Sequence, residues 1–179
     1  MLYSTSYSSP LGLIMIAAEQ DKLVGLWLEG QKYFAATASG SLVEKPDLPI
    51  FTTVRKWLDD YFSGLKPAIS DLPLAPKGGE FRRTVWDILC EIPYGELSTY
   101  GQIGKIAAAR MNKASMSGQA VGGAVGHNPI SIIIPCHRVV GSNGSLTGYA
   151  GGIEKKIKLL EHEGADMSGL FVPTKGTAL

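Results

Sequence analysis

The two side chains best suited to chemistry in this 179-residue chain are neighbours, Cys136 and His137, in the run Pro-Cys-His-Arg-Val that begins at Pro135. They follow the apolar run 130–134, so we expect the thiol to be buried. The thiolate is the reactive form of cysteine, and a nearby imidazolium lowers the thiol pKa. Neighbouring side chains point in different directions, so we expect a bridging water rather than a direct hydrogen bond.

Composition describes an ordinary globular protein of one or two small domains, with 45% hydrophobic and 18% charged residues. Its two cysteines cannot form a disulfide framework, and a four-ligand zinc site would need two of the three histidines as well. Cys90 lies among apolar residues at helical spacing, which predicts a small core side chain.

The apolar stretch 11–18 is short, has no basic stretch before it and soon meets Glu19 and Asp21. We therefore expect neither a signal peptide nor a membrane span, and no membrane partner. A free, reactive thiol fits a reducing compartment, which predicts a cytoplasmic location.

The pattern of the first third predicts a small α+β domain over residues 1–79. Strands are expected at 2–7, 13–18 and 23–28, the last two forming a hairpin, followed by a helix at 50–62 with one apolar face. Residues 65–79 contain three prolines and end in Gly78-Gly79, so we expect a linker there.

The second domain, residues 80–179, has the pattern of a winged helix-turn-helix. Helices are expected at 81–91, 100–109, 116–126 and 153–162, and Thr99 with Gln102 forms a capping-box pattern before the second of them. The Asn143-Gly144 turn predicts a β-hairpin between 138–140 and 145–147, which would be the wing.

Two further features of this domain bear on its partner. Gly122, Gly123 and Gly126 weaken the third helix, which requires either close approach of another molecule or close helix packing inside the domain. Net charge is only +1, yet residues 97–160 hold seven basic residues against one acidic, consistent with a phosphate-facing surface. The basic residues are Lys105, Arg110, Lys113, Arg138, Lys155, Lys156 and Lys158.

Four segments carry a resemblance to a known family: 119–129, 135–139, 147–152 and 159–164. There the chain closely resembles the O6-alkylguanine-DNA alkyltransferases, and the match runs from about Phe81 to Gly164. The resemblance implies DNA repair by transfer of an alkyl group from the O6 of guanine, and from the O4 of thymine, to Cys136. Each monomeric molecule would act once, without a cofactor, on a nucleotide flipped out of double-stranded DNA. Some relatives hold zinc in the N-terminal domain, but residues 1–79 contain neither Cys nor His, so we expect no metal.

The resemblance also implies roles for single residues. Cys136 would be the alkyl acceptor, His137 would take its proton through water, and Glu163 would orient His137. Asn128 would brace the segment that leads to the cysteine, and Tyr100 would protonate the departing guanine and contact a phosphate. Val139, Tyr149, Ala150 and Gly151 would line the base pocket. Thr99, Tyr100, Gln119, Ala120 and Gly123 would contact DNA, with the third helix in the minor groove.

Two positions depart from many relatives. Gln119 stands where arginine often fills the gap left by the flipped nucleotide, so we expect weaker DNA affinity with flipping retained. Ala150 stands where serine is frequent, so we expect a pocket more open to bulky alkyl groups.

Two other functions fit the residues alone. Cys136 and His137 would also serve a cysteine hydrolase, which would need an oxyanion hole and would turn over. A non-catalytic winged-helix lesion sensor would bind DNA without needing Cys136.

Overall fold

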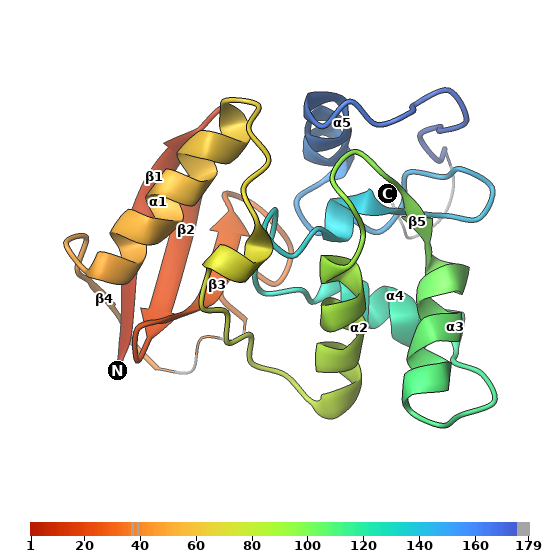
Figure 1. Cartoon of the computed structure of the whole chain (residues 1–179), viewed down its shortest axis with the longest axis horizontal. Coiled ribbons are helices and arrows are strands. Elements are labelled where there is room, and N and C mark those ends of the chain that lie inside the picture. Colours follow the sequence, from red (N-terminus) through yellow and green to blue (C-terminus); the bar gives the residue numbers. More distant parts are fainter. Residues whose placement is uncertain (37, 39, 175–179) are drawn as a thin grey trace. The chain divides into compact units, whose positions relative to one another are not determined.

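The computed structural model describes residues 1–36, 38 and 40–174, and the chain divides into two compact units (Figure 1). The first unit comprises Met1–Lys77 together with Pro129–Ile133. The second comprises Gly78–Asn128 and the chain from Ile134 onward. The segment that precedes Cys136 therefore leaves the second unit at residue 129 and returns to it at residue 134.

The first unit is built on a four-stranded sheet in the order β3-β2-β1-β4. Strands β1 (Leu2–Ser9), β2 (Gly12–Glu19) and β3 (Lys22–Leu28) are antiparallel neighbours. The three strands and the β2–β3 hairpin were predicted, whereas the pairing of β1 with β2 was not. Gln20 and Asp21 both have positive φ, which is the geometry of a tight hairpin turn. Strand β4 (Leu42–Glu44) pairs in parallel with β1 and was missed, because three residues give no periodic signal.

Helix α1 (Pro49–Phe62) covers one face of this sheet (Figure 1). Its buried residues recur at helical spacing, as predicted: Ile50, Phe51, Val54, Trp57, Leu58 and Tyr61.

Two segments pair along β3. The expected linker contains the short helix η1 (Ile69–Asp71), and beyond it Leu23 exchanges backbone hydrogen bonds with Pro73 and Ala75, both 2.8 Å long. Leu26 does the same with Pro129 (2.8 Å) and Ser131 (3.0 Å). The segment before Cys136 is thus held to β3 like a short extra strand.

The second unit is mainly helical. It contains α2 (Glu80–Cys90), α3 (Tyr100–Arg110), α4 (Gly118–Gly126) and α5 (Ile153–His162), close to the predicted ranges. The capping box at the start of α3 is present, with Thr99 Oγ1 accepting from the Gln102 amide at 3.2 Å. Trp86 of α2 is buried and donates its indole N–H to the Ala124 carbonyl of α4 at 2.8 Å, so these two helices are joined.

The predicted wing hairpin needs correction. The turn forms, since the Gly141 amide bonds the Ser145 carbonyl at 2.9 Å. However, β6 (Val139–Val140) pairs in parallel with β5 (Ser98–Thr99), and Ser145 bridges Phe171. The Asn-Gly sequence predicted the chain reversal at residues 143–144 correctly. It could not show that β5, which is distant in sequence, would form the backbone hydrogen bonds with β6.

Across residues 1–36, 38 and 40–174, no helix is long and apolar enough to cross a membrane. In the same part of the chain, no group of three or more His, Cys, Asp or Glu side chains is placed to hold a metal ion.

Candidate functional site

The cysteine lies in a buried turn. Cys136, His137 and Arg138 form the short helix η2, and Cys136 is only 4% exposed. The Asn128 side chain donates to the Ile134 carbonyl at 2.8 Å. This hydrogen bond joins the two residues that flank segment 129–133, which belongs to the first unit. The Cys136 amide bonds the same carbonyl at 2.8 Å, so the position of the thiol is set by this closure.

His137 and Arg138 both bind one carboxylate, that of Glu163 at the end of α5. The His137 Nε2 lies 2.6 Å from Glu163 Oε2, and Arg138 Nε donates to Oε1 at 2.7 Å. Arg138 also donates to the Ile92 carbonyl at 2.7 Å, and the Gly95 amide donates to Glu163 at 3.3 Å. Arg138 therefore has a structural position.

The partners of His137 determine which nitrogen carries its proton. Burial would raise the pKa of Glu163, but the hydrogen bonds and charges of His137 and Arg138 outweigh burial and hold that pKa well below its usual range. An ionised carboxylate only accepts, so His137 Nε2 carries the hydrogen. Burial lowers the pKa of His137 and, together with the charges of Arg138 and Lys156, outweighs the hydrogen bond and charge of Glu163, which raise it. The ring is thus neutral, with an unprotonated Nδ1 that has no partner among the described residues.

Opposing effects act on the pKa of the Cys136 thiol. Burial raises the pKa of Cys136, while a hydrogen bond from the Asn128 side chain and the positive charge of Lys156 lower it. His137 Nε2 bonds Glu163 and Nδ1 has no partner among the described residues, so neither nitrogen bonds the thiol, as expected for these two neighbours.

Lys156 is the residue that sequence reasoning misplaced. It was assigned to a phosphate-facing surface, yet it is fully buried and donates to the carbonyls of Val139 and Thr147, the latter at 2.9 Å. Burial lowers its pKa to about 8, although the charge of Cys136 opposes the shift. The sequence did contain a signal for the burial of Lys156. This lysine lies three residues after Ile153 and four before Leu160, which puts it on the apolar face of α5. Arg138 is likewise buried, so the basic surface is smaller than predicted.

The residues expected at the base pocket are placed as follows. Val139 is buried, and its carbonyl keeps one lone pair beyond the bond to Lys156. Tyr149 is 7% exposed, and its buried hydroxyl has no partner among the described residues. Ala150 and Gly151 are half-buried.

Tyr100 occupies the first position of α3, and its hydroxyl donates to the Thr147 carbonyl at 2.8 Å. A Cβ at Gly148 would lie 2.5 Å from that hydroxyl, and φ there is +79°. Glycine is therefore required at position 148 for both reasons.

Helix α4 presents small residues outward. Gln119 and Ala120 are exposed, and Gly122 and Gly123 are half-buried. An added Cβ at Gly122, Gly123 or Gly126 would meet nothing within 4 Å, whereas one at Gly104 of α3 would lie 3.3 Å from Val121. Packing between α3 and α4 thus explains Gly104 but not the glycines of α4.

The buried His137–Glu163 pair makes stability dependent on pH, which gives a first prediction. The unfolded chain protonates histidine below its ordinary pKa of 6.5 and glutamate below 4.5, while the folded chain resists both because both pKa values are lowered. The unfolded state then binds more protons, so stability falls as pH falls below 6.5 and again below 4.5. Denaturant unfolding from pH 8 to pH 4 measures this, and His137→Gln should remove the first decline. A stability that stayed constant or rose between pH 7 and pH 5 would contradict the neutral state of His137.

Together the fold and the site define a class: helix-turn-helix proteins in which a buried cysteine lies beside a histidine–carboxylate pair. Two domain families match the chain, "6-O-methylguanine DNA methyltransferase, ribonuclease-like domain" over residues 2–76 and "6-O-methylguanine DNA methyltransferase, DNA binding domain" over residues 80–165. The chain belongs to the O6-methylguanine-DNA methyltransferase family.

Individual relatives match this chain along most of their length. The methylated-DNA–protein-cysteine methyltransferase of Haemophilus influenzae is 42% identical, over 90% of this chain and 86% of that protein. Its counterpart in Methanosarcina acetivorans is 41% identical, over 92% of this chain and 99% of that protein. Among solved structures, Mycobacterium tuberculosis OGT in complex with DNA has a TM-score of 0.78 at 37% identity, covering 90% of this chain and 92% of that one.

Proposed function

We propose that this protein repairs DNA by moving the alkyl group of an O6-alkylguanine onto its own Cys136. The observation that carries this is a buried cysteine beside a His137–Glu163 pair, in a chain of this family with a helix-turn-helix domain. In the reaction a bond forms between Cys136 Sγ and the alkyl carbon, and the bond between that carbon and O6 breaks. The product thioether is not reversed by thiol exchange, so each molecule acts once. O4-alkylthymine presents the same type of leaving group and is a second substrate.

The proton leaves the thiol toward His137. Its Nδ1 is unprotonated, and one bridging water would carry the proton from Cys136 to it. Glu163 then stabilises the imidazolium that forms, and Arg138 keeps the carboxylate ionised. Lys156, buried close enough to influence the thiol pKa, stabilises the thiolate.

The departing guanine must gain a proton to leave as a neutral base. We assign this step to the Tyr100 hydroxyl, which donates to the Thr147 carbonyl. The proton that His137 took from the thiol then passes through solvent to the phenolate, so the transfer leaves neither residue charged. The unpartnered Tyr149 hydroxyl and the free lone pair of the Val139 carbonyl are suited to bind the base edge, with Ala150 and Gly151 completing the pocket.

The partner is double-stranded DNA, with α4 in the minor groove and the target nucleotide flipped out. Gln119, exposed on α4, would lie at the gap left by the nucleotide, with the exposed Ala120 also against DNA and Thr99 beside the backbone. We assign DNA binding and alkyl transfer to residues 80–179, as a monomer, and a supporting role to residues 1–79. We infer a cytoplasmic location, because a free, reactive thiol fits a reducing compartment.

Gly123→Ala tests the close approach of α4 to DNA. The new methyl group meets nothing in the protein, so we expect the helix to gain about 0.5–1 kcal/mol. DNA affinity should fall, because the methyl group separates the helix from the groove. Binding by fluorescence anisotropy measures the loss, and unchanged transfer from free O6-benzylguanine shows that the thiol site is intact. Full DNA affinity in the variant would mean that this face does not enter the groove.

Lys156→Met tests the electrostatic role of the buried lysine. Loss of one charge near Cys136 should slow transfer from free O6-benzylguanine about tenfold for each unit by which the thiol pKa rises. It should also move the pH–rate profile to higher pH, which a purely structural role would not do. Lys158→Met, on the exposed side of the same helix, is the matched control. A slower variant with an unshifted pH profile would contradict the role.

The function itself is tested by stoichiometry. With a fivefold excess of duplex containing O6-methylguanine, we expect lesion removal to stop after one equivalent per protein. A hydrolase would leave this DNA unchanged, and a lesion sensor would bind it without removing the methyl group. Either result, or continued turnover, would refute the proposal.

A further inference from the structure

The connection between α3 and α4 is longer than a helix-turn-helix requires. It spans residues 111–117, seven positions, where a turn of three or four usually suffices. Its first part is tightly folded: Asn112 has φ +54°, and the Lys113 amide bonds the Ala108 carbonyl at 2.8 Å. This is a Schellman closure of α3, and it turns the chain back alongside the helix.

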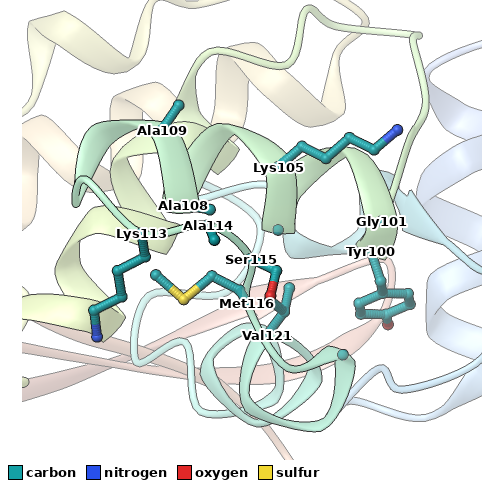
Figure 2. Close-up of a pocket in the computed structure, with 12 residues that line it drawn as sticks. Tyr100, Gly101, Lys105, Ala108, Ala109, Lys113, Ala114, Ser115, Met116 and Val121 are labelled. Carbon is teal, nitrogen blue, oxygen red and sulfur yellow. The ribbon is translucent and has the colours of Figure 1, made fainter.

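The long turn encloses a groove of about 510 Å³ against α3 and the start of α4 (Figure 2). Tyr100, Lys105 and small residues of α3 form one side, and residues 113–116 form the other. Val121 and Met116 add apolar surface. The two lysines are the charged residues of the lining, which contains no carboxylate.

The arrangement of these charges favours an extended anion over a compact one. Figure 2 shows Lys105 and Lys113 reaching toward opposite sides of the groove, with Ser115 and Met116 between them. Two separated cations match the repeated charges of a nucleic-acid strand better than one small anion. The alanines and glycines of α3 leave room for a backbone to approach closely.

We propose that this groove holds the sugar–phosphate backbone of one DNA strand beside the lesion, with Lys105 and Lys113 each neutralising a phosphate and Ser115 donating a hydrogen bond. The proposal rests on the proposed function and assigns a strand contact to the long turn. The groove shares Tyr100 with the proposed site and Gly118 with the start of α4, so a strand lying in it would continue toward the flipped nucleotide.

The experiment is the salt dependence of binding to an unmodified duplex by the double variant Lys105→Gln/Lys113→Gln. Each phosphate contact contributes about 0.9 to the slope of log K against log salt, so the double variant should lose about 1.8 from the magnitude of that slope and bind more weakly. Lys22→Gln, exposed at the start of β3, should change neither the slope nor the affinity. Transfer from free O6-benzylguanine should remain at the wild-type rate, because neither lysine touches Cys136.

An unchanged slope in the double variant would overturn the groove proposal, even if wild-type protein repairs DNA normally. Weaker binding with an unchanged slope would also overturn it, because the loss would not come from phosphate contacts. A third outcome would show a small-anion site instead: the double variant would lose binding of inorganic phosphate while its DNA binding stayed unchanged. Failure of the proposed function is a separate result: wild-type protein would leave O6-methylguanine in place.

Discussion

Cys136→Ala is expected to abolish alkyl transfer completely while leaving DNA affinity within about twofold of wild type. The substitution removes the only atom proposed to accept the alkyl carbon. Neither His137 nor Glu163, the other members of the proposed catalytic group, is a comparable nucleophile. The DNA contacts proposed above lie on α4 and the adjoining groove, so we expect them not to depend on the sulfur. The measurements are the O6-methylguanine content of a duplex after incubation and the dissociation constant by anisotropy.

Cys90 supplies the matched control. It is the other cysteine of the chain, partly exposed at the end of α2, and burial raises its pKa to about 11. Cys90→Ala should therefore transfer at the wild-type rate. Residual repair by Cys136→Ala, or loss of repair in Cys90→Ala, would show that the acceptor has been assigned wrongly.

Glu163→Gln is expected to have the second largest effect, on both stability and rate. Glutamine keeps the shape of the side chain but leaves Arg138 as a buried charge without a counter-ion, which costs about 3–5 kcal/mol. It also removes the anion that we propose stabilises His137 once it takes the thiol proton, so transfer should slow by about 10²-fold or more. Glu161→Gln, exposed in the last turn of α5 and two residues before Glu163, should behave as wild type.

A second variant separates the structural from the chemical role of Glu163. In Glu163→Gln/Arg138→Met the unpaired charge is gone, so much of the stability should return while transfer stays slow. Denaturant unfolding and single-turnover transfer from free O6-benzylguanine measure the two effects. Recovery of the rate together with stability would mean that Glu163 serves only to neutralise Arg138.

Local signals predicted much of the fold. The strands β1–β3, the helix α1 and the capping box of α3 each leave a short-range pattern, and each was found close to its expected position. The pairing of β6 with β5 joins residues about 40 apart in sequence, and no turn motif reveals it. Only the three-dimensional fold decides which strand receives those hydrogen bonds.

The site was predictable to a similar extent. The burial of Cys136 followed from the apolar run before it, but the partnership of His137 with Glu163, 26 residues apart, came from the family resemblance and not from spacing. Lys156 was misplaced because a lysine is normally solvated. Its burial depends on two backbone carbonyls that converge only in the folded chain.

The most direct test of the central claim is the mass of the intact protein after mixing with one equivalent of a duplex that contains O6-methylguanine. We predict that the protein gains a single methyl group in place of one proton, that peptide mapping places it on Cys136, and that the duplex is left with unmodified guanine. An unchanged protein mass, or a methyl group on any other residue, would contradict the account.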